Sequence, residues 1–114
     1  MPFINTKTTV SLDKTKRDSL TAALGKITSS CLNKGETWIM TGYEDNASLY
    51  FQGNQNGDTA YVEVKLFGTP SASGCAAMTK EVCALYEKEL GIPSERIYVS
   101  YYPTENWGWN GNNF

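Results

Sequence analysis

The pattern of apolar and polar residues predicts four strands along the chain. Residues 3–10 are rich in Thr, Ile, Val and Phe, a composition typical of a strand. Residues 61–67 and 96–102 alternate between apolar and polar, and residues 37–43 have an extended pattern. Because successive side chains of a strand point to opposite faces, each alternating segment has one face suited to a core.

Two helices are predicted where apolar residues recur at spacings of three and four. The first stripe follows Ser11 and Asp13, either of which can cap a helix, and Asn33 marks its end. Its members are Leu20, Ala23, Leu24, Ile27 and Cys31. The second stripe ends at Gly91 and Pro93, in the order typical of a helix C-terminus. Its members are Met78, Val82, Leu85 and Leu90.

The order strand, helix, strand therefore occurs twice. Residues 33–45 align without gaps with residues 91–103, at a separation of roughly 58 residues, and this superposes Tyr43 on Tyr101. Two βαβ units predict an α/β (α+β) fold in which a four-stranded mixed sheet has both helices on one face. We expect residues 1–114 to form a single domain. The uncovered edges of such a sheet favour a symmetric oligomer.

The charge and the apolar stretches exclude several classes of function. The formal net charge is -2, and the ten Lys and Arg residues are scattered without a basic stripe that could neutralise a phosphate backbone. We therefore expect no nucleic-acid partner. No apolar stretch approaches the roughly 18 residues of a membrane span, and no leader-like segment is present, so we expect a cytoplasmic protein or one released by an unconventional route.

The cysteines and the absence of histidine limit the available chemistry. Cys31, Cys75 and Cys83 form an odd set without a C-x-x-C pair, which favours reduced thiols over a disulfide framework. Without histidine the chain lacks the usual general base, the Ser-His and Cys-His nucleophile systems and any His-based zinc site. We expect no metal and no organic cofactor. A base must come from a carboxylate, a lysine or the amino terminus.

Pro2 is the candidate base. Once Met1 is removed, Pro2 has a free secondary amine that can take a proton, whereas an internal proline has a non-basic amide nitrogen. Apolar neighbours and a nearby lysine would both lower the affinity of this amine for a proton, and so favour its basic form at neutral pH. The first residues alone also fit the simpler interpretation that Met-Pro is a common way to begin a protein.

Several short motifs together resemble one family over the whole length of the chain. They are Met1–Ile4, Lys34 after the first helix, Gly68 after the third strand, Glu95–Tyr102 and Gly108–Gly111. In this order they resemble the macrophage migration inhibitory factor family of the tautomerase superfamily. The resemblance implies the same pair of βαβ units. It also implies a homotrimer in which three sheets surround a central channel and the sites lie at subunit interfaces.

The resemblance implies roles for three residues of one subunit. Pro2 matches the catalytic amino-terminal proline, and Lys34 matches the lysine that holds a substrate carboxylate. Phe67 matches a strand-end residue whose backbone amide contacts the substrate, and its ring would narrow the pocket. Taken without the resemblance, Lys34 is interpreted as a lysine that interacts with the dipole at a helix C-terminus.

Three further positions complete the implied site. Tyr98 matches a tyrosine donated by the neighbouring subunit, Ser100 replaces a usual asparagine, and Trp107 replaces a smaller apolar residue at the rim. Independently of the resemblance, Tyr98 and Ser100 lie on the strand face opposite the apolar residues Ile97 and Val99. Taken by itself, Tyr98 also fits an interface tyrosine with a satisfied hydroxyl.

The activity implied is that of a keto–enol tautomerase, an isomerase, acting on small aromatic α-keto acids such as phenylpyruvate, with dopachrome-type compounds as further candidates. Pro2 would act as general base. The alternative is a cytokine-like signalling protein that binds a cell-surface receptor and retains the pocket for structural reasons. The two hypotheses are separated by an assay for phenylpyruvate tautomerisation.

Overall fold

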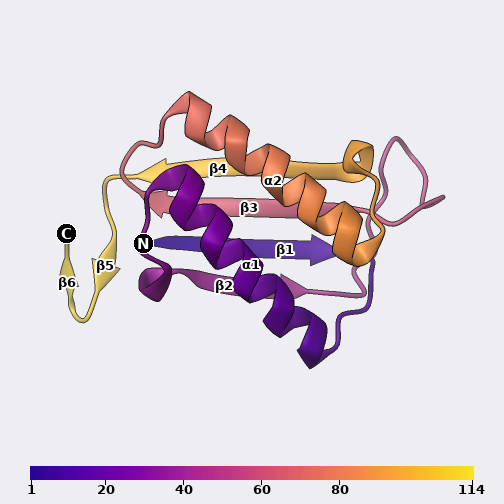
Figure 1. The fold of residues 1–114 in the computed structure, drawn as a ribbon, viewed down its shortest axis with the longest axis horizontal. Helices are drawn as coiled ribbons and strands as arrows, with labels where there is room; N and C mark the ends of the chain where they lie inside the picture. Colours follow the sequence, from indigo (N-terminus) through magenta and orange to yellow (C-terminus); the bar gives the residue numbers. More distant parts are fainter.

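The computed structural model describes residues 1–114 and contains two long helices packed on a four-stranded sheet (Figure 1). The strands of the sheet are β1 (Pro2–Thr8), β2 (Met40–Glu44), β3 (Ala60–Phe67) and β4 (Ile97–Thr104). The helices are α1 (Lys14–Leu32) and α2 (Ala72–Leu90), and the short 3-10 turns are η1 (Glu36–Trp38) and η2 (Ser94–Arg96). A small hairpin of β5 (Gly108–Trp109) and β6 (Asn112–Asn113) ends the chain.

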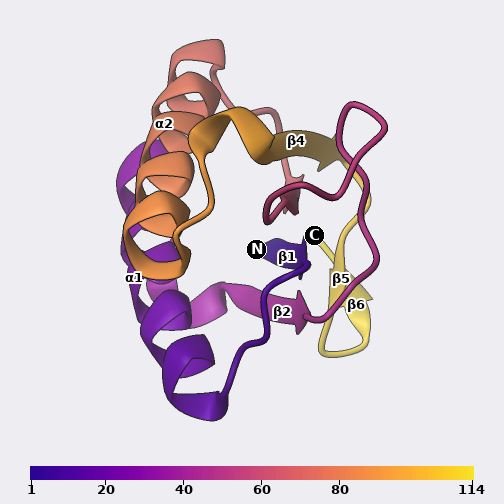
Figure 2. The ribbon, with the colours of Figure 1, turned by 90° about the vertical axis from the view of Figure 1, so that its right-hand side faces the viewer.

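The sheet is mixed, with the order β2-β1-β3-β4. The central strands β1 and β3 are antiparallel, whereas β2 is parallel to β1 and β4 is parallel to β3. Both helices cover the same face of the sheet (Figure 2). This architecture confirms the predicted pair of βαβ units. Neither helix combines the length and the apolarity that a membrane span requires.

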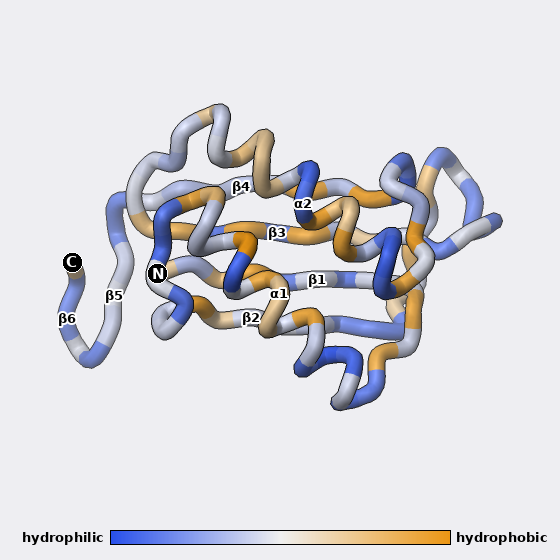
Figure 3. Tube along the Cα trace, in the orientation of Figure 1, coloured by the Kyte–Doolittle hydropathy of each residue, from blue (hydrophilic) through white to orange (hydrophobic).

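The core lies between the helices and the central strands. Val62, Val64 and Leu66 of β3 are buried in strict alternation with more exposed neighbours, as the sequence predicts. Ile4 and Thr6 of β1 follow the same alternation. Figure 3 shows the hydrophobic residues along β3 and the hydrophilic ones at the tip of the loop between β2 and β3.

The predicted stripes are close to the buried helix faces but differ in detail. On α2 the fully buried residues include Met78, Val82 and Tyr86, whereas the predicted Leu85 and Leu90 are only half-buried. Leu85 and Tyr86 are neighbours, and a rotation of the helix by one residue exchanges which of them faces the sheet. The expected extended segment 37–43 is also shorter, because η1 occupies its start and β2 begins at Met40.

The two halves of the chain repeat with a constant offset. Helices α1 and α2 are each 19 residues long and begin 58 residues apart. Their N-cap residues, Asp13 and Ser71, and their left-handed C-cap residues, Asn33 and Gly91, have the same separation. Each N-cap side chain accepts a hydrogen bond from a backbone N–H of the first turn, at 2.8 Å for Asp13 and 3.0 Å for Ser71.

The repeat extends to side-chain contacts between sheet and helix. The Tyr43 hydroxyl is 2.8 Å from Thr21 Oγ1 of α1, and the Tyr101 hydroxyl is 2.8 Å from Thr79 Oγ1 of α2. The second pair is offset from the first by 58 residues at both positions. The internal repeat inferred from the aligned tyrosines is therefore confirmed as a repeat of structure.

The three cysteines are half-buried and none forms a disulfide. Burial raises the pKa of the Cys31, Cys75 and Cys83 thiols above its ordinary value, and nearby carboxylates raise it further for Cys31 and Cys83. All three thiols are therefore protonated at neutral pH, in agreement with their interpretation as reduced, apolar packing residues.

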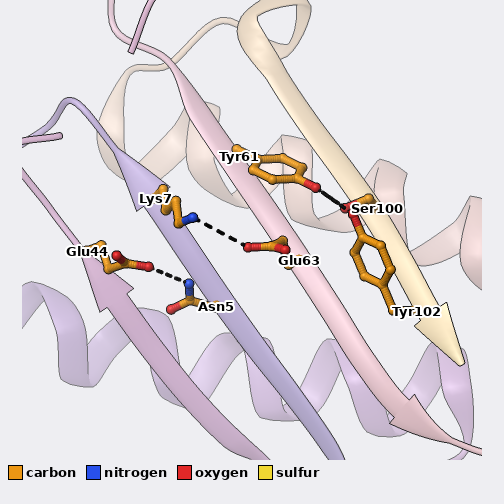
Figure 4. A network of polar contacts seen from close by, with 7 residues as sticks. All are labelled: Asn5, Lys7, Glu44, Tyr61, Glu63, Ser100 and Tyr102. Carbon is orange, nitrogen blue, oxygen red and sulfur yellow. Dashed lines mark hydrogen bonds and ion pairs between the residues drawn. The ribbon is translucent and has the colours of Figure 1, made fainter. Parts of the chain in front are cut away.

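The face of the sheet away from the helices carries polar side chains (Figure 4). Lys7 Nζ lies 3.9 Å from Glu63 Oε1, and Asn5 Nδ2 donates to Glu44 Oε2 at 2.7 Å. The side chains of Asn5, Lys7 and Glu63 point away from the helices, because their neighbours along β1 and β3 are the buried residues of the core. This polar face and the two edge strands remain uncovered in a single chain.

One buried polar contact joins α2 to the central strand. The Tyr86 hydroxyl and Thr6 Oγ1 lie 2.5 Å apart, and both side chains are fully buried. Burial is the main cause that raises the pKa of Tyr86, so its hydroxyl stays protonated at physiological pH. Either hydroxyl left alone in this core would be an unsatisfied polar group.

We predict that Tyr86→Phe and Thr6→Val each lower the free energy of unfolding by about 1–3 kcal/mol, because each leaves the other hydroxyl without a partner. The double variant is expected to be more stable than the sum of the two losses implies, since it removes both polar groups. Urea denaturation of the four proteins measures this coupling. Additive losses would show that the two hydroxyls do not depend on each other.

Candidate active site

A cleft of about 380 Å³ lies at the end of the sheet where β1 begins. It is bounded by the start of β1, the turn η1 with the start of β2, and the C-terminal hairpin, which lie close together at the left of Figure 1. Its lining residues are Met1, Pro2, Phe3, Thr37, Trp38, Ile39, Met40, Trp107, Gly108 and Trp109. Seven of the ten are hydrophobic, so charged forms of groups inside it are disfavoured.

Pro2 is buried and is one of the residues that line this cleft. It pairs with Leu66 at the end of β3, so a central strand of the sheet holds it on a rigid element. A proline suits this first position of a strand, because it has no N–H to leave unpaired. The candidate base therefore has a fixed position, which a loop would not give it.

Met1 covers the nitrogen of Pro2 in this form of the chain. The Met1 carbonyl accepts a hydrogen bond from the Phe67 N–H at 3.4 Å, and Met1 itself lines the cleft. Partial burial, and after it the positive charge of Lys34, lower the pKa of the Met1 α-amine below its ordinary value of 8.0. The surroundings of the amino terminus thus favour a free amine.

Lys34 and Phe67 lie together beside the amino terminus. Lys34 follows the left-handed residue Asn33, and its Nζ donates to the Phe67 carbonyl at 2.9 Å. Gly68 continues the chain with φ of +89°, a conformation that favours glycine, and an added Cβ there would lie 3.9 Å from Lys34 Nζ. The Phe67 ring packs on Phe114, with centroids 5.5 Å apart, and does not line the cleft.

Two indoles form one wall of the cleft. Trp38 of η1 and Trp109 of β5 meet edge to face, with ring centroids 5.0 Å apart and an interplanar angle of 79°. Trp109 is carried by a tight hairpin whose central residues Asn110 and Gly111 both have positive φ. Asn-Gly is the sequence most favoured in such a turn, and the hairpin places Trp109 on the same cleft as Met1 and Pro2. Trp107 also lines the cleft.

Tyr98 and Ser100 lie elsewhere in the same chain. Through the strand pairing, Pro2 is aligned with Leu66 and Pro103, whereas Tyr98 is aligned with Tyr61 near the other end of the sheet. The five residue-to-residue steps from Tyr98 to Pro103 span about 16 Å along β4. Tyr98 therefore cannot contact Pro2 of its own chain.

The hydroxyl of Ser100 is engaged on the polar face of the sheet. Ser100 Oγ donates to the Tyr61 hydroxyl at 2.8 Å, and the Tyr61 and Tyr102 hydroxyls are 2.7 Å apart (Figure 4). Within one chain the structure thus brings together four of the six predicted residues, Pro2, Lys34, Phe67 and Trp107, and leaves two apart from them.

A larger hollow, of about 560 Å³, lies between the two helices. Its charged side chains are those of Lys26 and Glu81, and Cys31 in it has a raised pKa. No terminal amine and no activated nucleophile faces this hollow, so we place the candidate site in the smaller cleft. Nowhere do three or more His, Cys, Asp or Glu side chains gather in a group able to hold a metal ion.

Trp38 and Met40 are residues of the cleft that the sequence analysis missed. Both fall in the segment expected to be extended, where alternation alone gives no reason to single them out. A usable signal was present nearby, since Asn110-Gly111 predicts a hairpin that returns Trp109 to the sheet. The partner of that indole, Trp38, is set by the 3-10 turn that precedes β2.

The fold and this cleft, with a proline at the start of a central strand, define a protein of the tautomerase superfamily. The model of the family described as macrophage migration inhibitory factor matches residues 1–114. The chain belongs to the macrophage migration inhibitory factor family.

Several known proteins are similar to the chain over nearly its whole length. The crystal structure of MIF2 from Leishmania major is 46% identical, with a TM-score of 0.93, and the match covers 100% of this chain and 97% of that one. A homologue from Prochlorococcus marinus is 34% identical, with a TM-score of 0.87 and 98% of each chain covered. Macrophage migration inhibitory factor of Xenopus laevis is 28% identical over 116 residues, which cover 100% of this chain and 99% of that protein.

We predict that Lys34→Gln raises the pKa of the Met1 α-amine in protein that retains Met1. Removal of the neighbouring positive charge makes protonation easier, while burial, the larger cause, still holds the pKa below 8.0. An NMR pH titration of the labelled amine measures the shift. Lys88→Gln, an exposed change in the last turn of α2, is the matched control and should leave the pKa unchanged. A lower pKa in Lys34→Gln would contradict the assigned contact.

Proposed function

We propose that the protein is a keto–enol tautomerase of small aromatic α-keto acids such as phenylpyruvate, with Pro2 as general base after removal of Met1. The observation that carries the proposal is the position of Pro2, which is buried on a central strand and lines an apolar cleft. Beside it lies Lys34, whose charge lowers the pKa of the terminal amine. Membership of the family supports the same class of reaction.

The chemistry requires an amine that is free at neutral pH. An ordinary α-amine has a pKa near 7.7–8.0 and is largely protonated there. Both causes that lower the pKa of the Met1 amine, burial and the charge of Lys34, act at this end of the sheet, and Pro2 is more deeply buried than Met1. A Pro2 amine in this position would therefore be a better-populated base.

The reaction then needs no metal and no organic cofactor. Lys34 would pair with the substrate carboxylate, while the aromatic ring of the substrate lies against the indoles of Trp38 and Trp109. Pro2 would take the proton from the carbon next to the keto group and, as the ammonium, return it to the carbonyl oxygen, which completes the enol and restores the free amine. The reverse sequence of proton transfers converts enol to keto acid.

Retained Met1 would block this site in two ways. It converts the nitrogen of Pro2 into an amide, which cannot take a proton. Its carbonyl also occupies the Phe67 N–H, the backbone donor proposed to contact the substrate. Removal of Met1 would therefore supply the base and free a donor in a single step.

We expect turnover of phenylpyruvate by protein that begins at Pro2 to exceed that of Met1-retaining protein by about 10²- to 10⁴-fold, the usual contribution of general-base catalysis. Intact-mass spectrometry assigns the amino terminus of each sample before the assay.

Pro2→Gly, with Met1 removed, keeps a terminal amine but makes it primary and flexible, so its rate of phenylpyruvate turnover should fall while the protein still folds. Equal rates with and without Met1 would exclude Pro2 as the base.

A homotrimer with sites shared between subunits is part of the proposal. Tyr98 lies about 16 Å along the sheet from the end that holds Pro2, so it can serve a cleft only in a neighbouring copy. The edge strands β2 and β4, together with the uncovered polar face, offer surfaces for such an association.

We expect light scattering at micromolar concentration to give the mass of a trimer. Tyr98→Ala should keep that mass and lower kcat/KM, because the phenol acts in the neighbour's cleft. Tyr50→Ala, an exposed aromatic on the loop between β2 and β3, is the control and should change neither quantity. A monomer with full activity would contradict the shared site.

The Xenopus laevis relative is named for inhibition of macrophage migration, an effect on cells, and this name supports a signalling protein as a second candidate. Binding to a cell-surface receptor is part of this second proposal. In that case the cleft around Pro2 would be retained for structural reasons and not for catalysis. A folded protein that begins at Pro2 but lacks activity toward aromatic α-keto acids would favour this candidate over the enzyme.

A further inference from the structure

The loop between β2 and β3 contains a rigid turn at residues 51–54. The Phe51 N–H donates to the Asn54 carbonyl at 2.9 Å, and the Asn54 N–H donates back to the Phe51 carbonyl at 3.1 Å. The central residues Gln52 and Gly53 both have positive φ, 52° and 77°. This is the geometry of a two-residue hairpin turn, in which the backbone has little freedom.

Arg96 of η2 links this turn by hydrogen bonds to the residues just before β3. Its guanidinium donates to Asn54 Oδ1 and to the Asn54 carbonyl, at 3.2 Å and 3.3 Å. Its Nε donates to the Asp58 carbonyl and to Thr59 Oγ1, both at 3.1 Å. The planar guanidinium holds these acceptors in one fixed arrangement, and its carbon lies 5.4 Å from the centre of the Phe51 ring.

The Phe51 ring in turn contacts Tyr98 at the start of β4. The two ring centroids are 5.3 Å apart and the planes meet at 70°, an edge-to-face pair. Tyr98 is 64% exposed, and its hydroxyl makes no hydrogen bond within the chain, in contrast to the hydroxyls of Tyr61 and Tyr101. The contact with the Phe51 ring restricts the rotamers that the exposed Tyr98 side chain can adopt.

We propose that Phe51 is a positioning residue for Tyr98, and that the turn 51–54 and Arg96 hold Phe51 in place for this purpose. The inference rests on the proposed function, because it concerns the phenol that would enter the cleft of a neighbouring copy. An exposed tyrosine samples several rotamers, and the ring must give up all but one of them when it enters a site. Contact with Phe51 restricts the ring beforehand, so less ordering remains for the reacting complex.

The test is a double-variant cycle on protein that begins at Pro2, assayed with phenylpyruvate. Phe51→Ala should lower kcat/KM by about 2- to 10-fold, the range expected from the loss of one aromatic pair. In a Tyr98→Ala background the same change should have no further effect, since Phe51 acts through Tyr98. Phe51→Tyr keeps an aromatic ring at this place and should restore most of the activity.

Two controls separate positioning from folding. Tyr50→Ala removes the adjacent exposed aromatic of the same loop and should leave kcat/KM unchanged. Phe51→Leu keeps an apolar side chain without the ring, and replaces Phe51→Ala in the cycle if the alanine variant fails to fold. Circular dichroism and light scattering confirm the fold and the mass of each variant.

The orientation of Tyr98 is measured directly by NMR of the isotope-labelled tyrosine. In the unaltered protein we expect one dominant rotamer and a ring-current shift from Phe51. Both should be lost in Phe51→Ala and kept in Tyr50→Ala. An unchanged rotamer distribution in Phe51→Ala would overturn the proposal, as would an equal loss of kcat/KM in the presence and absence of the Tyr98 ring.

The proposed function fails in a different way. If Tyr98→Ala leaves kcat/KM unchanged, Tyr98 has no part in turnover. That result excludes the shared site, and with it any effect of Phe51 on turnover through Tyr98. A loss in Tyr98→Ala combined with additive losses in the double variant excludes only the positioning role.

Discussion

The antiparallel pairing of β1 with β3 is the contact on which the rest of the structure depends. It joins the first residues of the chain to a strand about sixty residues later, at the centre of the sheet. Both strands bury one row of side chains under the helices, so the core fixes their relative position. The same pairing places Pro2 opposite Leu66 and brings the Met1 carbonyl to Phe67. A one-residue slip would turn the buried row outward and displace Pro2 from the cleft.

Local patterns in the sequence account for most of the fold. Alternation in residues 61–67, the cap at Asp13 and the stop at Gly91 each depend on neighbours in the chain, and each agrees with the structure. The choice of Tyr86 over Leu85 as the buried residue could not be predicted, because the two differ by one step around the helix and the buried hydroxyl needs Thr6 from another element. Long-range partners of this kind leave no local signal.

The candidate site shows the same division. Pro2, Lys34 and Phe67 were predicted from motifs and lie together, because each sits at an end of a strand or helix at one end of the sheet. Trp38 was missed because its place depends on a 3-10 turn and on an indole more than sixty residues away. Tyr98 lies at the opposite end of the sheet, so a site that includes both Pro2 and Tyr98, as we propose, needs two copies of the chain. The sequence of one copy does not show how the two would combine.

The hydrogen bond between Met1 and Phe67 bears on when the proposed removal of Met1 could take place. While β3 is still being made, the Met1–Pro2 peptide bond has no strand beside it and is open to an aminopeptidase. Ribosomes add about 5–20 residues per second, so this interval lasts several seconds. Once β3 pairs with β1, Pro2 is buried and the bond before it is held against Phe67. The removal of Met1 that the proposed function requires would therefore compete with the folding of the chain. On this proposal, a nascent chain that folds too early would keep its first residue.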